Sequence, residues 1–383
     1  MVRVDWDQLL ADCVDFTQRM IQTPSMPHEE AQVAQLIAAE MRGLGFAGVH
    51  IDGIGNVIGR IRGQDPKLAA LVLNSHTDHV DPGDPELWPV PPFSGSIVDG
   101  RILGRGACDI KGPLAVQVYS MAAFLRAGIR PRRDVVFTGV VQEEVGGAGA
   151  QYWVENLDYP VALVVLGEPS ENRIALGHRG IVQTWVTFAG RSVHASMPES
   201  GDNPNYALAT FLGRLAEQQG KLSSHPLLGR TSVTPTVVEV DTTSFNVTPA
   251  WTRVLLDCRT ASESLDSLYD FYSSLATDLP FALEDAMGCG PSQSDTTIYG
   301  YYTAPESEVA QKAKAAIGKG MGREAEFISY QFATDGRLFV PYDIPVIGYA
   351  PGEGKLAHTV RERISIAQMG EAIRGYVGLL QEF

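Results

Sequence analysis

The chain has 383 residues, of which 44% are hydrophobic and 20% are charged, and its formal net charge is −15. This composition is typical of a globular protein, and the length favours two domains over a single core. The excess of acids disfavours nucleic acid and anionic membranes as partners. No apolar run is long enough to span a bilayer, and early acids argue against a secretory signal. The four cysteines are widely spaced without a Cys-x-x-Cys motif, so we expect a reducing, cytoplasmic location.

Apolar residues at helical spacing predict helices at 5–20 and 29–44 in the first part of the chain. Segments 49–52 and 56–61 are typical of short strands, and an apolar run over 68–74 predicts a buried strand. This buried strand leads directly into the first polar motif of the chain.

His76 and Asp78 follow the buried strand two residues apart, so an extended backbone would point both side chains to one face. A histidine can bind a metal through one ring nitrogen while a carboxylate holds the other ring N–H. A buried, hydrogen-bonded His-Asp pair without metal explains the same residues. The motif therefore needs partners elsewhere in the chain.

A second polar turn carries Asp109, between the glycines of Gly104-Arg105-Gly106 and Gly112. A helix is predicted after it, from 114 to about 127. Asp109 is then either the N-cap of that helix or a residue of a functional site.

Two further strands, predicted at 134–141 and 161–166, run into the acids Glu143, Glu144 and Glu168. Adjacent carboxylates at the end of a buried strand repel one another and lose hydration unless a cation offsets them; a solvated loop is the alternative. Ligands of open α/β sheets bind beyond the carboxyl ends of the strands. The alternation of strands and helices up to this point predicts an α/β domain.

From Gly180 onward the pattern changes to strand–helix–strand–strand–helix, which predicts a separate α+β module. After this module the chain returns to a helix and strands like those of the first domain. We therefore expect an α/β domain formed by 1–179 and 296–383, with the α+β module inserted at 180–295.

The polar strand ends together form one set of candidate site residues. Its members are His76 with Asp78, Asp109, Glu143 with Glu144, Glu168, and His358, which follows an apolar strand at 344–349. Two histidines with several carboxylates suit zinc better than magnesium or calcium. One bridging carboxylate, with one histidine and one carboxylate for each metal, would make a two-metal hydrolase site.

The sequence resembles the co-catalytic metallopeptidases that include acetylornithine deacetylase, succinyl-diaminopimelate desuccinylase, aminoacylase and glutamate carboxypeptidase. The matching segments are Ser75–Val80, Gly104–Gly112, Gln142–Glu144, Gly167–Ser170, and Ala357–Thr359 with Glu362. They occur in the family's order over nearly the whole chain. The resemblance implies a catalytic α/β/α sandwich domain with an inserted α+β sandwich that acts as a lid or dimerisation domain.

The resemblance also implies roles for the polar strand ends. His76, Asp109 and Glu168 would hold one zinc ion, and Asp109, Glu144 and His358 the other; cobalt or manganese would be able to replace zinc. Asp78 would orient His76. Glu143 would be the general base that takes a proton from the metal-bridging water.

In the inserted module, His194 matches a histidine that the family extends into the partner subunit's site to stabilise the oxyanion. Without the resemblance, His194 is typical of a surface turn. Asn246 and Arg259 match positions that bind the substrate carboxylate, although Arg259 could instead form a strand-end ion pair with Asp257. The remaining substrate-side candidates are Arg179 at the hinge and Gly336 in the loop Thr334-Asp335-Gly336-Arg337.

The expected function is that of a homodimeric zinc amidohydrolase, with two zinc ions per subunit, that cleaves an N-acetyl or N-succinyl amino acid or a short peptide. Within the same family, a dipeptidase or carboxypeptidase is the alternative. A catalytically silent relative would have lost a ligand or the base, and none is lost here. A nucleotide-binding protein is disfavoured because the glycine runs match neither G-x-G-x-x-G nor a P-loop.

Overall fold

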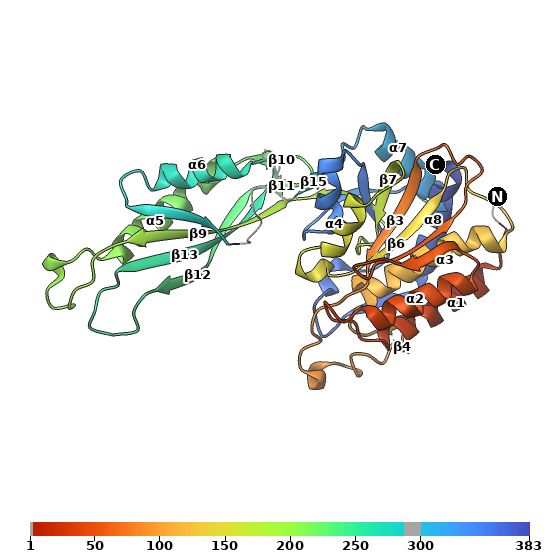
Figure 1. Cartoon of the computed structure of the whole chain (residues 1–383), viewed down its shortest axis with the longest axis horizontal. Helices are drawn as coiled ribbons and strands as arrows, with labels where there is room; N and C mark the ends of the chain where they lie inside the picture. The colour runs from red at the N-terminus through yellow and green to blue at the C-terminus, as the bar shows by residue number, and fades with distance from the viewer. Residues whose placement is uncertain (1–2, 287–299) are drawn as a thin grey trace. The chain divides into compact units, whose positions relative to one another are not determined.

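The computed structural model describes residues 3–286 and 300–383, which form two compact units (Figure 1). Unit 1 comprises the chain up to Gly177, Tyr302–Tyr330 and Thr334–Phe383, and unit 2 comprises His178–Tyr301 and Gln331–Ala333. The predicted insertion ends at residue 295, which lies outside the described residues.

Nine strands of the described residues form one mixed sheet, which belongs mainly to unit 1. Its order is β1 (Ala47–Ile51), β2 (Val57–Ile61), β6 (Val135–Val140), β3 (Ala70–His76), β7 (Val161–Leu166), β17 (Val346–Tyr349), β8 (Ile174–His178) and β15 (Tyr301–Tyr302), with β16 (Phe327–Tyr330) paired to β8. The four central strands β6, β3, β7 and β17 run parallel. Their carboxyl ends therefore meet at one edge of the sheet, where open α/β sheets bind ligands.

Helices cover this sheet, as the α/β sandwich prediction requires. They are α1 (Trp6–Ile21), α2 (Ala31–Gly43), α3 (Gly112–Arg126), α4 (Ala148–Glu155), α7 (Glu308–Met321) and α8 (Ile366–Glu382). Helix α3 is buried along most of its length because it contacts strands β3 and β6 as well as helices α1 and α8. Asp5 begins α1 by accepting a hydrogen bond from the Gln8 amide at 3.1 Å, and Ser307 and Ser365 cap α7 and α8 in the same way.

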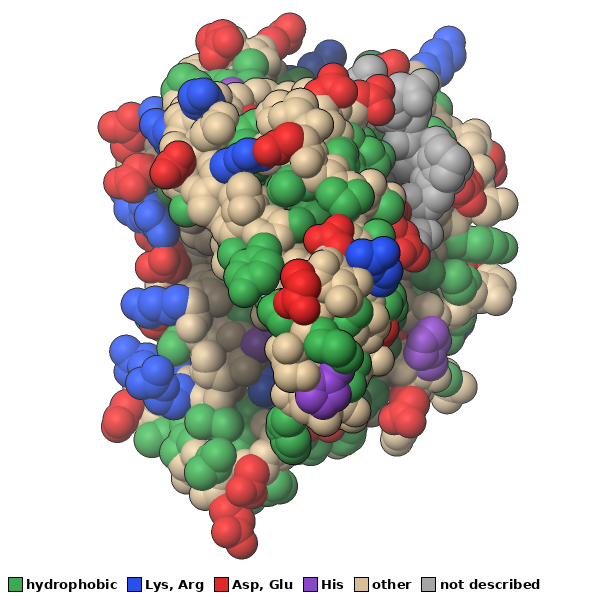
Figure 2. Space-filling model, turned by 90° about the vertical axis from the view of Figure 1, so that its left-hand side faces the viewer, with side chains coloured by type: hydrophobic (Ala, Val, Ile, Leu, Met, Phe, Trp, Pro, Cys, Tyr) green, Lys and Arg blue, Asp and Glu red, His purple; other side chains and the backbone are tan. Residues whose placement is uncertain are grey.

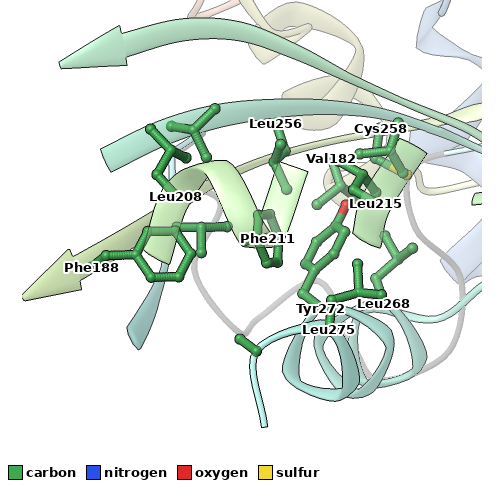
Figure 3. Close-up of a cluster of buried hydrophobic side chains, with 14 residues drawn as sticks. Val182, Phe188, Leu208, Phe211, Leu215, Leu256, Cys258, Leu268, Tyr272 and Leu275 are labelled. Carbon is green, nitrogen blue, oxygen red and sulfur yellow. The ribbon is translucent and has the colours of Figure 1, made fainter. Parts of the chain in front are cut away.

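Unit 2 contains a four-stranded antiparallel sheet in the described part of the chain, ordered β12 (Ser232–Val240), β13 (Trp251–Thr260), β9 (Gly180–Ala189) and β14 (Phe281–Asp285). Strands β9 and β13 alternate buried and half-buried residues, so one face of the sheet forms a core. Helices α5 (Pro204–Gln218) and α6 (Leu265–Leu275) pack on that face (Figure 3). The predicted combination of an α/β domain with an α+β module is confirmed.

Some elements differ from their predictions. Helix α4 was not expected, because Gly149 and the glycines just before it have low helix propensity and mask the apolar pattern. The predicted strand–helix–strand–strand–helix pattern lacks strand β14, which follows the end of α6 at Leu275 and Pro280, a residue that cannot continue a helix. A small sheet, β18 (Arg363–Ser365), β5 (Arg101–Leu103) and β4 (Ser96–Val98), joins two segments far apart in the sequence.

The charged residues form no single patch on the face shown in Figure 2. Asp and Glu side chains are spread across that face and interleaved with Lys, Arg and apolar groups. On this face the acidic side chains are therefore ordinary solvated surface groups. Within the described residues, every helix is too short or too polar to cross a bilayer.

We predict that Phe211→Ala destabilises unit 2 by about 3–5 kcal/mol, because it removes a large side chain from a close-packed core. Phe211 is fully buried, and its ring centroid lies 5.5 Å from that of Phe188. Urea unfolding of the whole chain measures the change. The control is Tyr206→Ala on the same helix, where the side chain is 76% exposed. Equal effects of the two substitutions would contradict the packing described here.

Candidate metal centre

His76 is the last residue of strand β3, and its ring is buried at the edge where the parallel strands end. Its Nδ1 lies 3.0 Å from the backbone oxygen of Asp78 and 3.4 Å from the Asp78 carboxylate. Both of these oxygens are hydrogen-bond acceptors, so Nδ1 carries a proton. Nε2 is then the ring nitrogen that is available as a ligand. Nε2 points to Asp109 Oδ1 at 3.1 Å and to Glu168 Oε1 at 3.8 Å.

Asp109 places its two carboxylate oxygens against two different histidines. Oδ1 faces His76, while Oδ2 lies 3.3 Å from Nε2 of His358. That same Nε2 lies 3.1 Å from Oε1 of Glu144. Asp109 is therefore shared between a buried His76–Glu168 pair and a more open His358–Glu144 pair.

The histidine and carboxylate atoms around Asp109 are close enough to one another to bind a metal ion. Ligand atoms of a tetrahedral zinc ion, with bonds of about 2.0–2.2 Å, lie about 3.3–3.6 Å apart. The four distances around Asp109 range from 3.1 to 3.8 Å. Ligand atoms of His76, Asp109 and Glu144 also lie within 4.8 Å of one another. The residues fit zinc in both spacing and donor type.

Burial and the two histidines shift the pKa values of the carboxyl groups in this cluster in opposite directions. Burial alone would raise the pKa of Asp109, but His358 and His76 outweigh burial and lower it. Burial opposes the charge on His76, yet hydrogen bonding, first to Asp109, raises its pKa well above the ordinary value. Hydrogen bonds, again first to Asp109, raise the pKa of His358 to about 10. Burial raises the pKa of Glu168 well above its usual range. Metal ions would supply the positive charge that protons supply here.

Carboxylates from other segments accept hydrogen bonds from the backbone amides of the turn at Glu143–Glu144. Asp78 accepts hydrogen bonds from the amides of Glu143 at 3.2 Å and Glu144 at 3.1 Å, and Glu30 accepts one from Gln142 at 3.1 Å. Asp78 thus orients His76 and also fixes the next two acids. Glu144 faces the histidine at 358, whereas no hydrogen bond of the Glu143 carboxylate to a described residue is observed.

Asp335 is a buried acid that the sequence pattern did not indicate; the predicted substrate-side residue of this loop is its neighbour Gly336. The Gly336 amide donates to Thr334 Oγ1 at 3.1 Å, so it stabilises its own turn. Asp335 is 2% exposed, and neither of its carboxylate oxygens has a hydrogen-bond partner among the described residues. A Cβ at Gly147 would collide with Oδ1 of Asp335, which explains the glycine there. Burial raises the pKa of Glu143 well above its usual range, and the charge of Asp335 adds to this effect.

The other predicted site residues lie in unit 2. His194 Nε2 is 3.4 Å from Asn246 Nδ2, and its Nδ1 is 2.7 Å from the Ser196 hydroxyl. Arg259 binds Asp257 through Nε at 2.7 Å and Nη2 at 3.3 Å, which is the strand-end ion pair considered as its alternative role. Arg179 donates to the backbone oxygen of residue 230 at 2.9 Å.

Comparison with known proteins adds a family match. A model of the peptidase family M20/M25/M40 matches residues 72–382. The uncharacterized protein YgeY of Escherichia coli K12 is 29% identical over 92% of this chain and 90% of its own length. A succinyl-diaminopimelate desuccinylase of Thioalkalivibrio sulfidiphilus is 27% identical over 97% of this chain and 99% of its own. The solved structure of aminopeptidase PepT from Bacillus cereus shares the fold, with a TM-score of 0.77 at 18% identity, covering 99% of both chains.

Proposed function

This chain belongs to peptidase family M20/M25/M40, and we propose that within the family it is a two-zinc amidohydrolase of N-acetyl or N-succinyl amino acids. The observation that carries the proposal is the Asp109 carboxylate, which lies between two separate histidine–carboxylate pairs. His76 and Glu168 would complete the set for one ion, and His358 and Glu144 the set for the other. Similarity to a desuccinylase supports the acyl-amino-acid substrate.

Glu143 is the proposed general base of this reaction. When bound, the two metal ions supply Lewis-acid polarisation of the scissile carbonyl and make water acidic enough to react near neutral pH. Glu143 takes the proton of the attacking water as the carbon–oxygen bond forms, and passes it to the amine nitrogen as the carbon–nitrogen bond breaks. Asp78 keeps His76 and the Glu143 backbone in place.

Substrate selection is proposed for residues of unit 2 and the 334–337 loop. Asn246 and Arg259 would bind the substrate carboxylate, and His194 would extend into the site of the other subunit of a dimer and donate to the carbonyl oxygen there as it becomes negative. Two of the five N–H donors of Arg259 bind Asp257, so a substrate carboxylate would bind through the remaining donors or displace Asp257.

We predict metal-dependent hydrolysis of an N-acyl amino acid. The protein would be stripped of metal, restored with two equivalents of zinc, and assayed against N-acetylornithine, N-acetyl-lysine, N-acetylmethionine, succinyl-diaminopimelate and several dipeptides. Cleavage of an acyl amino acid only after zinc is restored is the expected result. Cleavage of dipeptides alone would contradict the deacylase proposal and support the dipeptidase alternative. Activity that persists without metal would contradict the proposal.

We predict that Glu143→Gln lowers turnover by about 10²–10⁴-fold, because the amide cannot accept the water's proton. Zinc stoichiometry should stay at the wild-type value, since Glu143 is not a proposed ligand. Glu155→Gln, an exposed change at the end of α4, is the matched control. Full turnover by Glu143→Gln would show that Glu143 is not the general base. Loss of zinc from this variant would indicate that Glu143 is a metal ligand instead.

A homodimer through the inserted module is part of the same proposal. Strand β12 is at the edge of its sheet in the described part of the chain and exposes Val237, Val238 and Val240. Pairing two such edges would cover this apolar surface. Light scattering should therefore give about twice the 41.4 kDa mass of one chain, and Val238→Lys should reduce it towards a single chain. A single-chain mass for the wild type at all concentrations would exclude the dimer.

A further inference from the structure

One buried carboxylate joins the two segments that carry Asp109 and His358. Glu362 is 1% exposed and lies four residues after His358. Its Oε1 accepts hydrogen bonds from the backbone amides of Cys108 and Asp109, both at 3.1 Å. Its Oε2 accepts one from Nη1 of Arg105 at 2.6 Å. Glu362 therefore binds the backbone of the shared carboxylate residue directly.

Arg105 extends this connection on the other side. Its side chain is 3% exposed, and its Nη1 also lies 3.4 Å from the backbone oxygen of Thr359, the residue after His358. Its Nη2 lies 3.3 Å from the backbone oxygen of Asp81, in the segment that follows His76. The Arg105–Glu362 pair thus contacts three of the segments that supply proposed ligands.

We propose that Glu362, together with Arg105, is a positioning residue that sets metal affinity by holding Asp109 and the His358 segment at the correct separation. The inference rests on the two-zinc site proposed above. It adds a residue pair that would control zinc affinity without contacting metal or substrate. A purely stabilising role explains the pair less well. Buried ion pairs contribute little net stability compared with apolar residues of similar size, whereas a fixed set of donors and acceptors specifies geometry.

Glu362→Gln tests the proposal most directly. The single oxygen of a glutamine can serve the two backbone amides or Arg105, but not both, and its amide group would place a donor against another donor. Zinc affinity of the metal-stripped protein would be measured by competition with a chromophoric chelator. We expect zinc binding about 10- to 100-fold weaker than in the wild type. This is the usual effect of removing a residue that hydrogen-bonds to a metal ligand and orients it. The visible spectrum of the cobalt-substituted protein should change as well.

Glu40→Gln is the matched control, because Glu40 is also a carboxylate in unit 1 that pairs with an arginine. It accepts from Arg19 at 2.9 Å and from the Tyr119 hydroxyl at 2.5 Å, and it contacts none of the proposed ligands in the described structure. We expect Glu40→Gln to lower the melting temperature of the metal-free protein while leaving zinc affinity and the cobalt spectrum unchanged.

The outcomes separate this inference from the proposed function. If the wild type binds two zinc ions and Glu362→Gln binds them equally well, Glu362 has only a structural role and the inference is wrong. If the wild type binds no zinc, the proposed function fails first. Should Glu362→Gln not fold, Arg105→Lys keeps the charge but loses the fork, whose Nη1 contacts Glu362 and Thr359 and whose Nη2 contacts Asp81. Weaker zinc binding by that variant supports the inference, and unchanged binding overturns it.

Discussion

Repulsion between buried carboxylates is the constraint on which the centre of unit 1 depends. Asp109, Glu144 and Glu168 converge on His76 and His358, with Asp335 also buried and without a hydrogen-bond partner among the described residues. Two like charges about 4 Å apart repel by about 4 kcal/mol at an effective dielectric constant of about 20. Two histidines cannot offset this many carboxylates. The arrangement is therefore one that divalent cations stabilise, and the parallel strands keep it assembled for them.

Carboxylates that bind backbone amides hold the turns in this arrangement. Asp78 accepts from two consecutive amides of the turn at 143–144, and Glu362 accepts from two consecutive amides of the turn at 108–109. Gln142 and His358 adopt left-handed backbone with φ of 60° and 61°. That conformation costs a non-glycine residue about 1–2 kcal/mol, so neighbouring contacts must maintain it. The geometry around Asp109 is thus imposed by the surrounding fold.

The sequence was sufficient to predict the family, the two-part fold and the residues that converge around Asp109. Each of those residues follows an apolar strand or a glycine-rich turn, and parallel strands bring their carboxyl ends to one edge. Glu30 and Glu362 could not be assigned roles in this way. Their partners are backbone amides 112 and 254 residues distant, and a backbone amide leaves no signal in a side-chain pattern. Arg259 is the opposite case. Its observed partner, Asp257, is only two residues away, so the sequence alone could predict this ion pair.

The exposure of the proposed ligands indicates which side of the centre is open. The His76 side chain is 1% exposed and that of Glu168 is 8% exposed, whereas the His358 side chain is 52% exposed. The centre is therefore open to solvent at His358, whereas it is closed at the buried strand ends that carry His76 and Glu168. In the proposed mechanism the buried His76 and Glu168 would hold a metal ion, whereas the residues of unit 2 and of the 334–337 loop would select the substrate.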